Sequence, residues 1–510
     1  MKIKNIFLFL GIIVYCLTGF QPDVLAQKKK RKIEIIHSNS LKYNQKENPN
    51  IRKFIGDVSF RHNKFIMHCD SAYSYLDKNK IDAFGDVHIE KGDSLELFGD
   101  FLSYNGDKNF GKIRRNVKLD DKRAQLYTDS LNFDSQNNYA YYFNGGRIIN
   151  EDKTISSRLG HYYSDEDLAY FKDNVEILDT NYIVHADTLK YNTKTETAYF
   201  FGPTEIYSDE NYLYCENGWY KTKTEQFLFR KKALYKKDNR IIKGDTLYFD
   251  DPKGYGQIKQ NAVIEDTSKN IILKGNYSEY SENPQNAYLT DSAVMINIDE
   301  ENDSLFLHAD TLKSQYDSTG EYRIFRAYYK VKIFKNDLQG MCDSLAYTLK
   351  DSVIRMFDNP VLWSDSTQSS ADTIHIYTKN NNLDKVNLKQ SAFIITQEDS
   401  TRFNQIKGRK MIGYLRENKL HRVEVDGNGE TIYYTKDGNT IVGINKAISS
   451  NLVITLKNNQ VARINMLTDP NGTLYPLGSA EDVKLKGFNW RTNNRPVSKD
   501  DIFIWKIEGQ

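Results

Sequence analysis

The sequence predicts an all-β fold made of stacked repeats of about 30 residues. The 510 residues include 35 Tyr and 26 Phe but only 9 Pro, a composition that favours strands. One short motif returns every 29 residues for five steps between Gly99 and Gly244. Within the repeats, apolar and polar residues alternate with a period of two, which is typical of half-buried strands.

The first half of each repeat reads small residue, Asp, Ser or Thr, Leu, any residue, Tyr. A clear copy is Ala186-Asp187-Thr188-Leu189-Lys190-Tyr191. The Asp column of the repeat consists of Asp70, Asp100, Asp129, Asp187, Asp245, Asp310, Asp343 and Asp372. The apolar alternation changes parity at Asp187-Thr188, which predicts a β-bulge or corner there. Because Asp and Thr side chains bond backbone N–H groups freed at such a kink, we interpret the Asp column as structural and not catalytic.

The second half of the repeat ends in an alternating apolar stretch, as in Ala83-Phe84-Gly85-Asp86-Val87-His88-Ile89. Polar turns separate the halves, so each repeat supplies about two strands, and stacking buries their apolar face. We expect β-repeat domains over residues 27–395 and degenerate β repeats over 396–468. Residues 469–510 form a C-terminal tail, expected to cap the free sheet edge. The alternative fold is a parallel β-helix.

Residues 1–26 have the features of a signal peptide. Lys2 and Lys4 precede an apolar run, and Val24-Leu25-Ala26 offers a cleavage site. The alternatives are an uncleaved membrane anchor and a lipoprotein modified at Cys16. We expect export to the periplasm, with the mature chain soluble there or associated with the outer membrane.

Several functional classes lack support in the sequence. The 70 Lys and Arg nearly balance the 68 Asp and Glu, so no nucleic-acid partner is expected. The mature cysteines Cys69, Cys215 and Cys342 occupy the small, buried position of the repeat, where they cannot reach one another. No nucleophile elbow, zinc-protease motif or P-loop occurs. We therefore expect no catalytic residues, no metal and no cofactor; a glycan-cleaving parallel β-helix is the enzyme alternative.

The half-motif of residues 83–89, followed by Gly99-Asp100-Phe101-Leu102-Ser103-Tyr104, resembles the repeat of the LptA/OstA family and of the periplasmic N-terminal domain of LptD. The resemblance covers roughly residues 33–395. It implies antiparallel strands in a V-shaped β-jelly roll, an elongated form often called a β-taco. It also implies lipopolysaccharide as ligand, with its lipid A acyl chains inside. Inner- and outer-membrane Lpt components would be partners, with end-to-end self-association.

The candidate lining of such a groove consists of apolar residues from the second half-motif: Val87, Ile89, Val117, Leu119, Val175, Ile177, Val263, Val331 and Ile333. The alternative is that these residues pack a dry core. The basic run at residues 28–32 either contacts lipid phosphates or forms a solvated N-terminus. Two functions therefore stay open: a non-enzymatic conduit for lipopolysaccharide from the inner to the outer membrane, and an exported β-solenoid that serves adhesion or acts on glycans.

Overall fold

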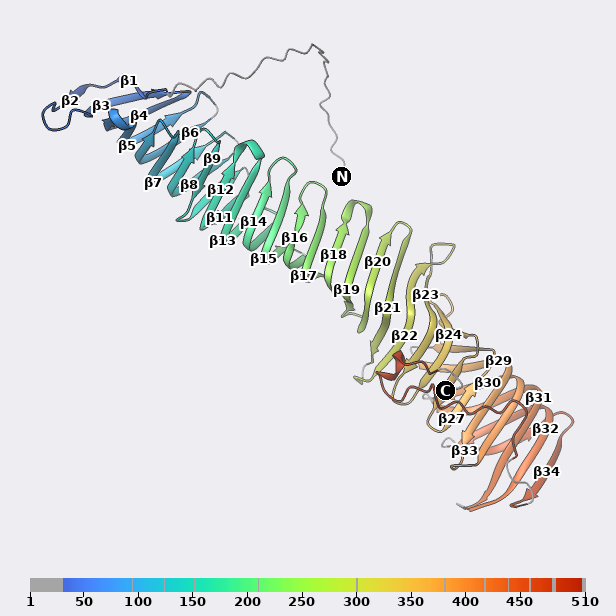
Figure 1. Cartoon of the computed structure of the whole chain (residues 1–510). Coiled ribbons are helices and arrows are strands. Elements are labelled where there is room, and N and C mark those ends of the chain that lie inside the picture. The colour runs from blue at the N-terminus through green and yellow to red at the C-terminus, as the bar shows by residue number, and fades with distance from the viewer. Residues whose placement is uncertain are drawn as a thin grey trace, which may run out of the picture. The chain divides into compact units, whose positions relative to one another are not determined.

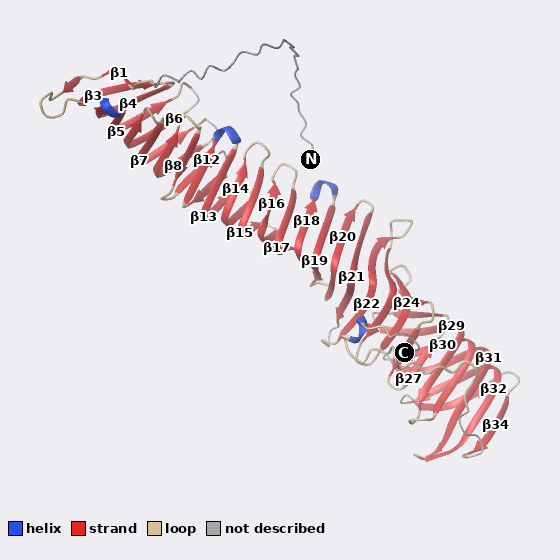
Figure 2. Cartoon of the chain, in the orientation of Figure 1, coloured by secondary structure: helices blue, strands red, loops and turns tan. Residues whose placement is uncertain are grey.

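The computed structural model describes residues 31–506 apart from residues 94, 123, 151–152, 210, 300, 380–381, 417–418, 439, 458–459 and 479–482. The expected signal peptide, residues 1–26, lies outside the described residues. The described chain is almost entirely strand, with four single-turn 3-10 helices (Figure 2). Within it, no helix has the length and apolar character needed to cross a membrane.

The chain divides into two compact units. Unit 1 comprises Met1–Arg115 and Asp134–Gln136, and unit 2 comprises Asn116–Phe133 and Asn137–Gln510. The elements of unit 1 are β1 (Glu34–His37), β2 (Ser40–Lys42), β3 (Ile51–His62), β4 (Phe65–Tyr75), η1 (Leu76–Lys78), β5 (Lys80–Glu90) and β6 (Glu96–Asn105). Two strands contribute residues to both units, β7 (Phe110–Asp120) and β8 (Gln125–Asp134).

Unit 2 continues with a long series of strands (Figure 1). Its first part contains β9 (Tyr139–Tyr142), β10 (Gly146–Asn150), β11 (Lys153–Ser157), β12 (Leu159–Tyr163), η2 (Ser164–Glu166), β13 (Leu168–Leu178), β14 (Tyr182–Asn192), β15 (Thr197–Ser208), β16 (Asn211–Lys221), β17 (Gln226–Lys237), β18 (Arg240–Asp250), η3 (Asp251–Lys253), β19 (Tyr255–Asp266), β20 (Ile271–Glu282) and β21 (Gln285–Ile298). Its second part contains β22 (Ser304–Tyr316), β23 (Arg323–Phe334), β24 (Gln339–Thr348), β25 (Val353–Phe357), β26 (Val361–Ser364), β27 (Thr367–Ser370), β28 (Thr373–Lys379), β29 (Asn382–Gln397), β30 (Phe403–Arg416), β31 (Lys419–Asp437), β32 (Thr440–Lys457), β33 (Gln460–Met466), β34 (Asn471–Pro476) and η4 (Asp501–Phe503).

Strand pairing follows the order of the chain. From β13 to β24, each strand pairs antiparallel with the next one. This meander confirms the predicted stack of antiparallel strands. It excludes the parallel β-helix for the described repeats, because that fold requires parallel neighbours.

A bulge interrupts the long strands at the predicted column. Between β13 and β14, Asp173 and Asn174 stand opposite Asp187 alone. Asp173 and Asn174 have φ angles of 62° and 54°, in the left-handed region. A two-against-one bulge bends the strand and changes the parity of its side chains. The bulge predicted from the sequence at Asp187-Thr188 is therefore confirmed.

In unit 2 these bulges form a crease that separates two walls. Wall A contains the strand segments on one side of the crease, such as residues 168–172 and 188–192, and wall B contains those on the other side, such as residues 175–178 and 182–186. The inner faces meet, because the rings of Tyr235 in wall B and Phe249 in wall A have centroids 5.5 Å apart. Together the walls form a β-jelly roll with an apolar interior. We call the side opposite the crease, between the two sets of turns, the mouth.

Small residues occupy the wall B position next to the crease, including Ala186, Cys215, Ala233, Gly244, Ala262 and Ala293. The converging wall A leaves little room there, since a Cβ added at Gly244 would lie 2.4 Å from Ile258 Cγ2. Cys69, Cys215 and Cys342 are buried and free, which confirms their predicted role as small core residues. Burial raises the pKa of the Cys215 thiol to about 12.

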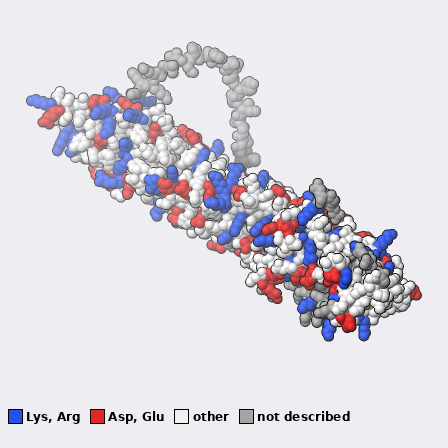
Figure 3. All heavy atoms as spheres, turned by 60° about the horizontal axis from the view of Figure 1, so that its bottom comes forward, with Lys and Arg blue, Asp and Glu red and all other residues white. Residues whose placement is uncertain are grey.

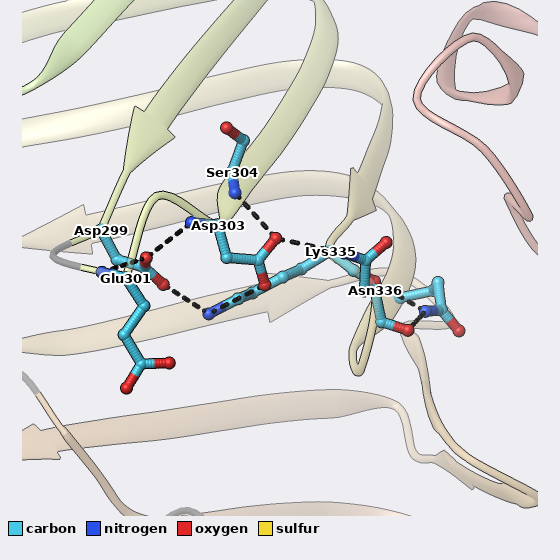
Figure 4. Close-up of polar contacts among 7 residues, drawn as sticks. Asp299, Glu301, Asp303, Ser304, Lys335 and Asn336 are labelled. Atoms are coloured by element: carbon cyan, nitrogen blue, oxygen red, sulfur yellow. Dashed lines mark hydrogen bonds and ion pairs between the residues drawn. The ribbon is translucent and has the colours of Figure 1, made fainter.

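The rim of wall B is made of polar turns that bind one another. Lys335, in the turn after β23, contacts two carboxylates of the β21–β22 turn, Asp299 and Asp303 (Figure 4). Its Nζ lies 2.9 Å from Asp299 Oδ2 and 3.7 Å from Asp303 Oδ2. Asn336 Nδ2 also donates to Asp303 Oδ1 at 3.2 Å. The turns at this rim are thus held by charge and by amide hydrogen bonds, while the apolar side chains lie inside.

The C-terminal residues 483–506 form an extended segment, here called the strap. Buried glutamines bind its backbone. Gln368 Nε2 donates to Asn489 O at 2.7 Å, and Gln368 Oε1 accepts from Arg491 N at 2.8 Å. Gln405 Oε1 accepts from Leu485 N at 2.9 Å in the same manner. Side-chain amides therefore satisfy strap groups that have no strand partner.

The strap lies on the outer face of wall B. Along β29, Ala392 and Ile394 belong to the interior cluster, whereas the alternate residues Phe393 and Ile395 pack in a second cluster with Leu485 of the strap. Adjacent strand residues face opposite sides, so the second cluster lies outside. Wall B is therefore buried on both faces in this region.

The course of the strap differs from the expectation that residues 469–510 cap the free sheet edge. Residues 471–476 do extend the sheet as β34, which pairs with β32. The strap then runs back toward earlier strands and ends near β22 and β23, where Phe503 lies 4.7 Å from the His308 ring and Lys332 Nζ donates to Ile504 O. The physical reason is the apolar outer face of wall B, which the strap covers.

Candidate functional site

The interior between the walls is the candidate site. The predicted lining residues that are buried are Val87, Ile89, Val117, Val175, Ile177, Val331 and Ile333. Leu119 is half-buried. Val175 and Ile177 belong to one apolar cluster of unit 2, and Val331 and Ile333 belong to another. Val175, Ile177, Val331 and Ile333 therefore lie along the interior of unit 2 and do not converge at one point, while Val87 and Ile89 are buried within unit 1. Contact of the predicted lining with a lipid stays a prediction.

Val263 is an exception that corrects the sequence-based lining. Its neighbours Ala262 and Ile264 pack with the interior cluster, and the register of β19 with β20 is continuous from Ala262 to Ile264. Val263 consequently points to the outer face of wall B. In other repeats a Val occupies this inward position, but in β19 Ala262 occupies it. Aligning Val263 with those Val residues therefore shifted the predicted lining by one residue.

The interior is sealed near the crease and more open near the mouth in the β11–β20 part of unit 2. Leu189, Phe229 and Leu247, next to the crease, have 0% exposure. A row of larger side chains nearer the mouth is half-buried and packs on this core: Tyr162, Tyr182, Tyr191, Tyr220, Tyr235 and Phe249. Sequence reasoning did not select this row, although Tyr191 and Phe249 end the small-Asp-x-Leu-x-aromatic motif.

One ammonium group lies among the phenols of this row. Lys153 Nζ is 3.6 Å from Asp179 Oδ2 and 5.9 Å from the centre of the Tyr182 ring. Burial raises the pKa of Tyr182, Tyr191 and Tyr220, and the charge of Lys153 opposes that rise in all three. Since Tyr182 belongs to wall B while Tyr191 and Tyr220 belong to wall A, polar groups of both walls come together at the mouth.

The Asp column follows the crease. Each of six members stands alone opposite two bulge residues: Asp70, Asp100, Asp187, Asp245, Asp310 and Asp343. Asp129 lies within β8, and Asp372 directly precedes β28. Neighbouring groups bind these carboxylates, as where Asn261 Nδ2 donates to Asp245 Oδ2 at 2.8 Å. Each member within a strand lies on a different one, from β4 to β24.

The charged surface is mixed. On the face drawn in Figure 3, Lys and Arg alternate with Asp and Glu and form no extended patch of one sign. In the described part of the chain, the structure brings together no group of three side chains suited to hold a metal ion. The apolar interior is therefore the feature with the clearest chemical character.

Paired walls joined at a bulged crease, with an apolar interior, define a repeat β-jelly roll. Residues 30–187 and 173–241 match the family model described as OstA-like protein. The N-terminal repeats, residues 30–241, are thus similar to OstA-like proteins.

Comparison with solved structures finds LptH from Pseudomonas aeruginosa, described as the LptA homologous periplasmic component of the conserved lipopolysaccharide transport device. The two chains are 15% identical, the match covers 26% of this chain and 95% of that chain, and the TM-score is 0.19. Comparison with curated proteins gives no match.

Proposed function

We propose that this protein binds lipopolysaccharide and carries it through the periplasm from the inner to the outer membrane, for outer-membrane assembly. The observation that carries the proposal is the apolar interior between two walls, in a chain whose N-terminal repeats are OstA-like. This role requires no reaction and no cofactor. The lipid A acyl chains would lie between the walls and the sugar headgroup at the mouth.

The physical basis is a path of similar contacts. An acyl chain that slides from one strand pair to the next exchanges aliphatic and aromatic neighbours for others of the same kind, so no position becomes a deep trap. Transfer of about ten methylenes from water to such an interior would gain roughly 8 kcal/mol. Because residues at the crease are already packed, the walls must part near the mouth to admit the chain.

The sheet edges are the proposed contacts with Lpt components of the two membranes or with a second copy of this chain. At the C-terminal end, β33 and β34 pair with β32 on one side, and no described strand pairs with their other side. Leu467 and Leu474 beside this edge are 62% and 64% exposed. A free edge with apolar side chains is suited to continue its sheet with another chain.

The test is to isolate the full exported chain without detergent and to measure bound lipid by mass spectrometry. We expect lipopolysaccharide in the preparation. Depletion of the protein in its native cells should also leave newly made lipopolysaccharide at the inner membrane. Lipid-free protein together with normal delivery on depletion would contradict the proposal.

A further inference from the structure

The interior of unit 2 is closed to different degrees along its length. In the C-terminal strands, residues of the mouth-side row of wall A are small enough to be sealed: Ile376, Val423 and Ile454 are 5%, 1% and 1% exposed. The corresponding row in β14–β18 contains two buried residues, Ala198 and Phe227, which alternate with the half-buried Tyr191, Tyr220 and Phe249. The strap, as far as residues 483–506 describe it, covers the outer face of wall B in the C-terminal strands. The β11–β18 stretch is thus the less tightly closed part.

Contacts across the mouth in this stretch are aromatic. Tyr235 of wall B lies 5.5 Å from Phe249 and 6.3 Å from Phe227, both in wall A. Phe227 in turn lies 5.1 Å from Phe249 and 6.5 Å from Tyr220. Each such ring pair adds only a small stabilisation beyond its area burial, so these few contacts between the walls can open at low cost.

The chemistry of this row suits the boundary between acyl chains and a polar headgroup. A tyrosine places its ring against apolar groups and its hydroxyl in water, which is why tyrosine is enriched at membrane interfaces. Tyr182, Tyr191 and Tyr220 are half-buried and pack on the interior cluster, and the ammonium group of Lys153, which is paired with Asp179, lies at the same level. The partner that matches is an amphiphile with apolar chains and an anionic, hydroxyl-rich headgroup.

We propose that the β11–β18 stretch is the place where the walls part to take up the lipid, with Tyr235, Phe249 and Phe227 as the closing contact and Lys153 facing the headgroup. This inference rests on the proposed function and adds a location to it. When the walls part, acyl chains would pack against the Tyr235 ring in place of Phe249 and Phe227, so one apolar contact replaces another. The C-terminal interior, held by the strap, would stay closed at this stage.

The test places a photoreactive phenylalanine analogue at single positions of the full chain and irradiates with purified lipopolysaccharide. Tyr220 and Tyr235 probe the proposed stretch, and Ile376 probes the C-terminal interior. Tyr199, on the outer face of wall A, is the matched control. We expect lipid adducts at Tyr220 and Tyr235 at least tenfold above those at Ile376 and Tyr199. Equal adducts at Tyr220, Tyr235 and Ile376 would overturn the location but leave the carrier function intact, whereas adducts at no interior position would contradict both.

A second measurement does not depend on the analogue. Tyr235→Ala removes the ring that joins the walls and should speed lipopolysaccharide uptake several-fold, with Tyr248→Ala on the outer face as control. Lys153→Gln should weaken retention of lipopolysaccharide but not of its dephosphorylated form. Uptake at the wild-type rate in Tyr235→Ala, with fold confirmed by circular dichroism, would argue against a closing contact at this place.

Discussion

Close packing at the crease predicts that Gly244 cannot be enlarged without cost. A Cβ at this position would lie 2.4 Å from Ile258 Cγ2, about 1.0 Å less than the shortest ordinary contact of 3.4 Å. Gly244 lies in the wall B segment of β18 and Ile258 lies in the wall A segment of β19, so the clash is between the two walls. Overpacking of this kind costs about 1–3 kcal/mol. Gly244→Ala should lower the free energy of opening of β18 and β19 by that amount, measured by hydrogen exchange of their amides.

A double-mutant cycle tests the cause of that loss. Ile258→Ala alone should cost about 2–5 kcal/mol because it leaves a cavity. In the double variant the new methyl group at position 244 enters that cavity. The loss of opening free energy measured for the double variant should therefore be smaller than the sum of the two single-variant losses by at least about 1 kcal/mol. Gly472→Ala is the control, since its nearest heavy atoms are 3.8 Å away and no loss is expected. Additive losses, or a wild-type opening energy in Gly244→Ala, would refute the convergence of the walls at this column.

Three further predictions concern the strap and the core. Gln368→Ala removes two backbone bonds and the acceptor of the buried Trp363 Nε1, so it should weaken strap docking by about 2–3 kcal/mol, detected as faster proteolysis within residues 483–506. Burial lowers the pKa of Lys332 from its ordinary 10.5 to about 8. The docked state therefore favours the neutral amine of Lys332. Docking of the strap should strengthen as pH rises from about 8 to 10.5 and stay constant below about 8. A Lys332→Met variant that retains this pH dependence would exclude Lys332 as its source. Cys215, with its pKa raised to about 12, should resist thiol reagents at pH 8 until the chain is unfolded; rapid labelling of the native chain would show that the crease is open.

The bulges and the small buried positions could be predicted from the sequence because the same pattern recurs in many copies of the repeat. The change in apolar parity at Asp187 predicted the bulge. The small-residue position that Cys69 and Cys215 share predicted that both side chains are buried. These features depend on residues adjacent in sequence. An error arose where one copy departs from the pattern: at Ala262 the inward position carries Ala and the following Val263 points outward.

Features that depend on tertiary contact were not predictable in the same way. The strap has no repeat, and its partners Gln368 and Gln405 look like ordinary strand polar residues in the sequence. The uninterrupted apolar run Phe393-Ile394-Ile395 was the available signal, because a strand buried on both faces loses its alternation. The row at the mouth was also missed: Tyr191 shares the parity of the buried Leu189 and therefore points inward, but that the residue is only half-buried and meets wall B depends on tertiary contacts.

The central claim is that lipid lies between the two walls. Spin labels at Thr180 and Thr195, in exposed turns of the wall B and wall A rims that flank β14, report the width of the mouth. Pulsed electron-paramagnetic-resonance distances should be measured on the full chain, free and with one equivalent of lipopolysaccharide bound. The account predicts a shift to longer distances on binding. An unchanged distance distribution, with the lipid demonstrably bound, would contradict it.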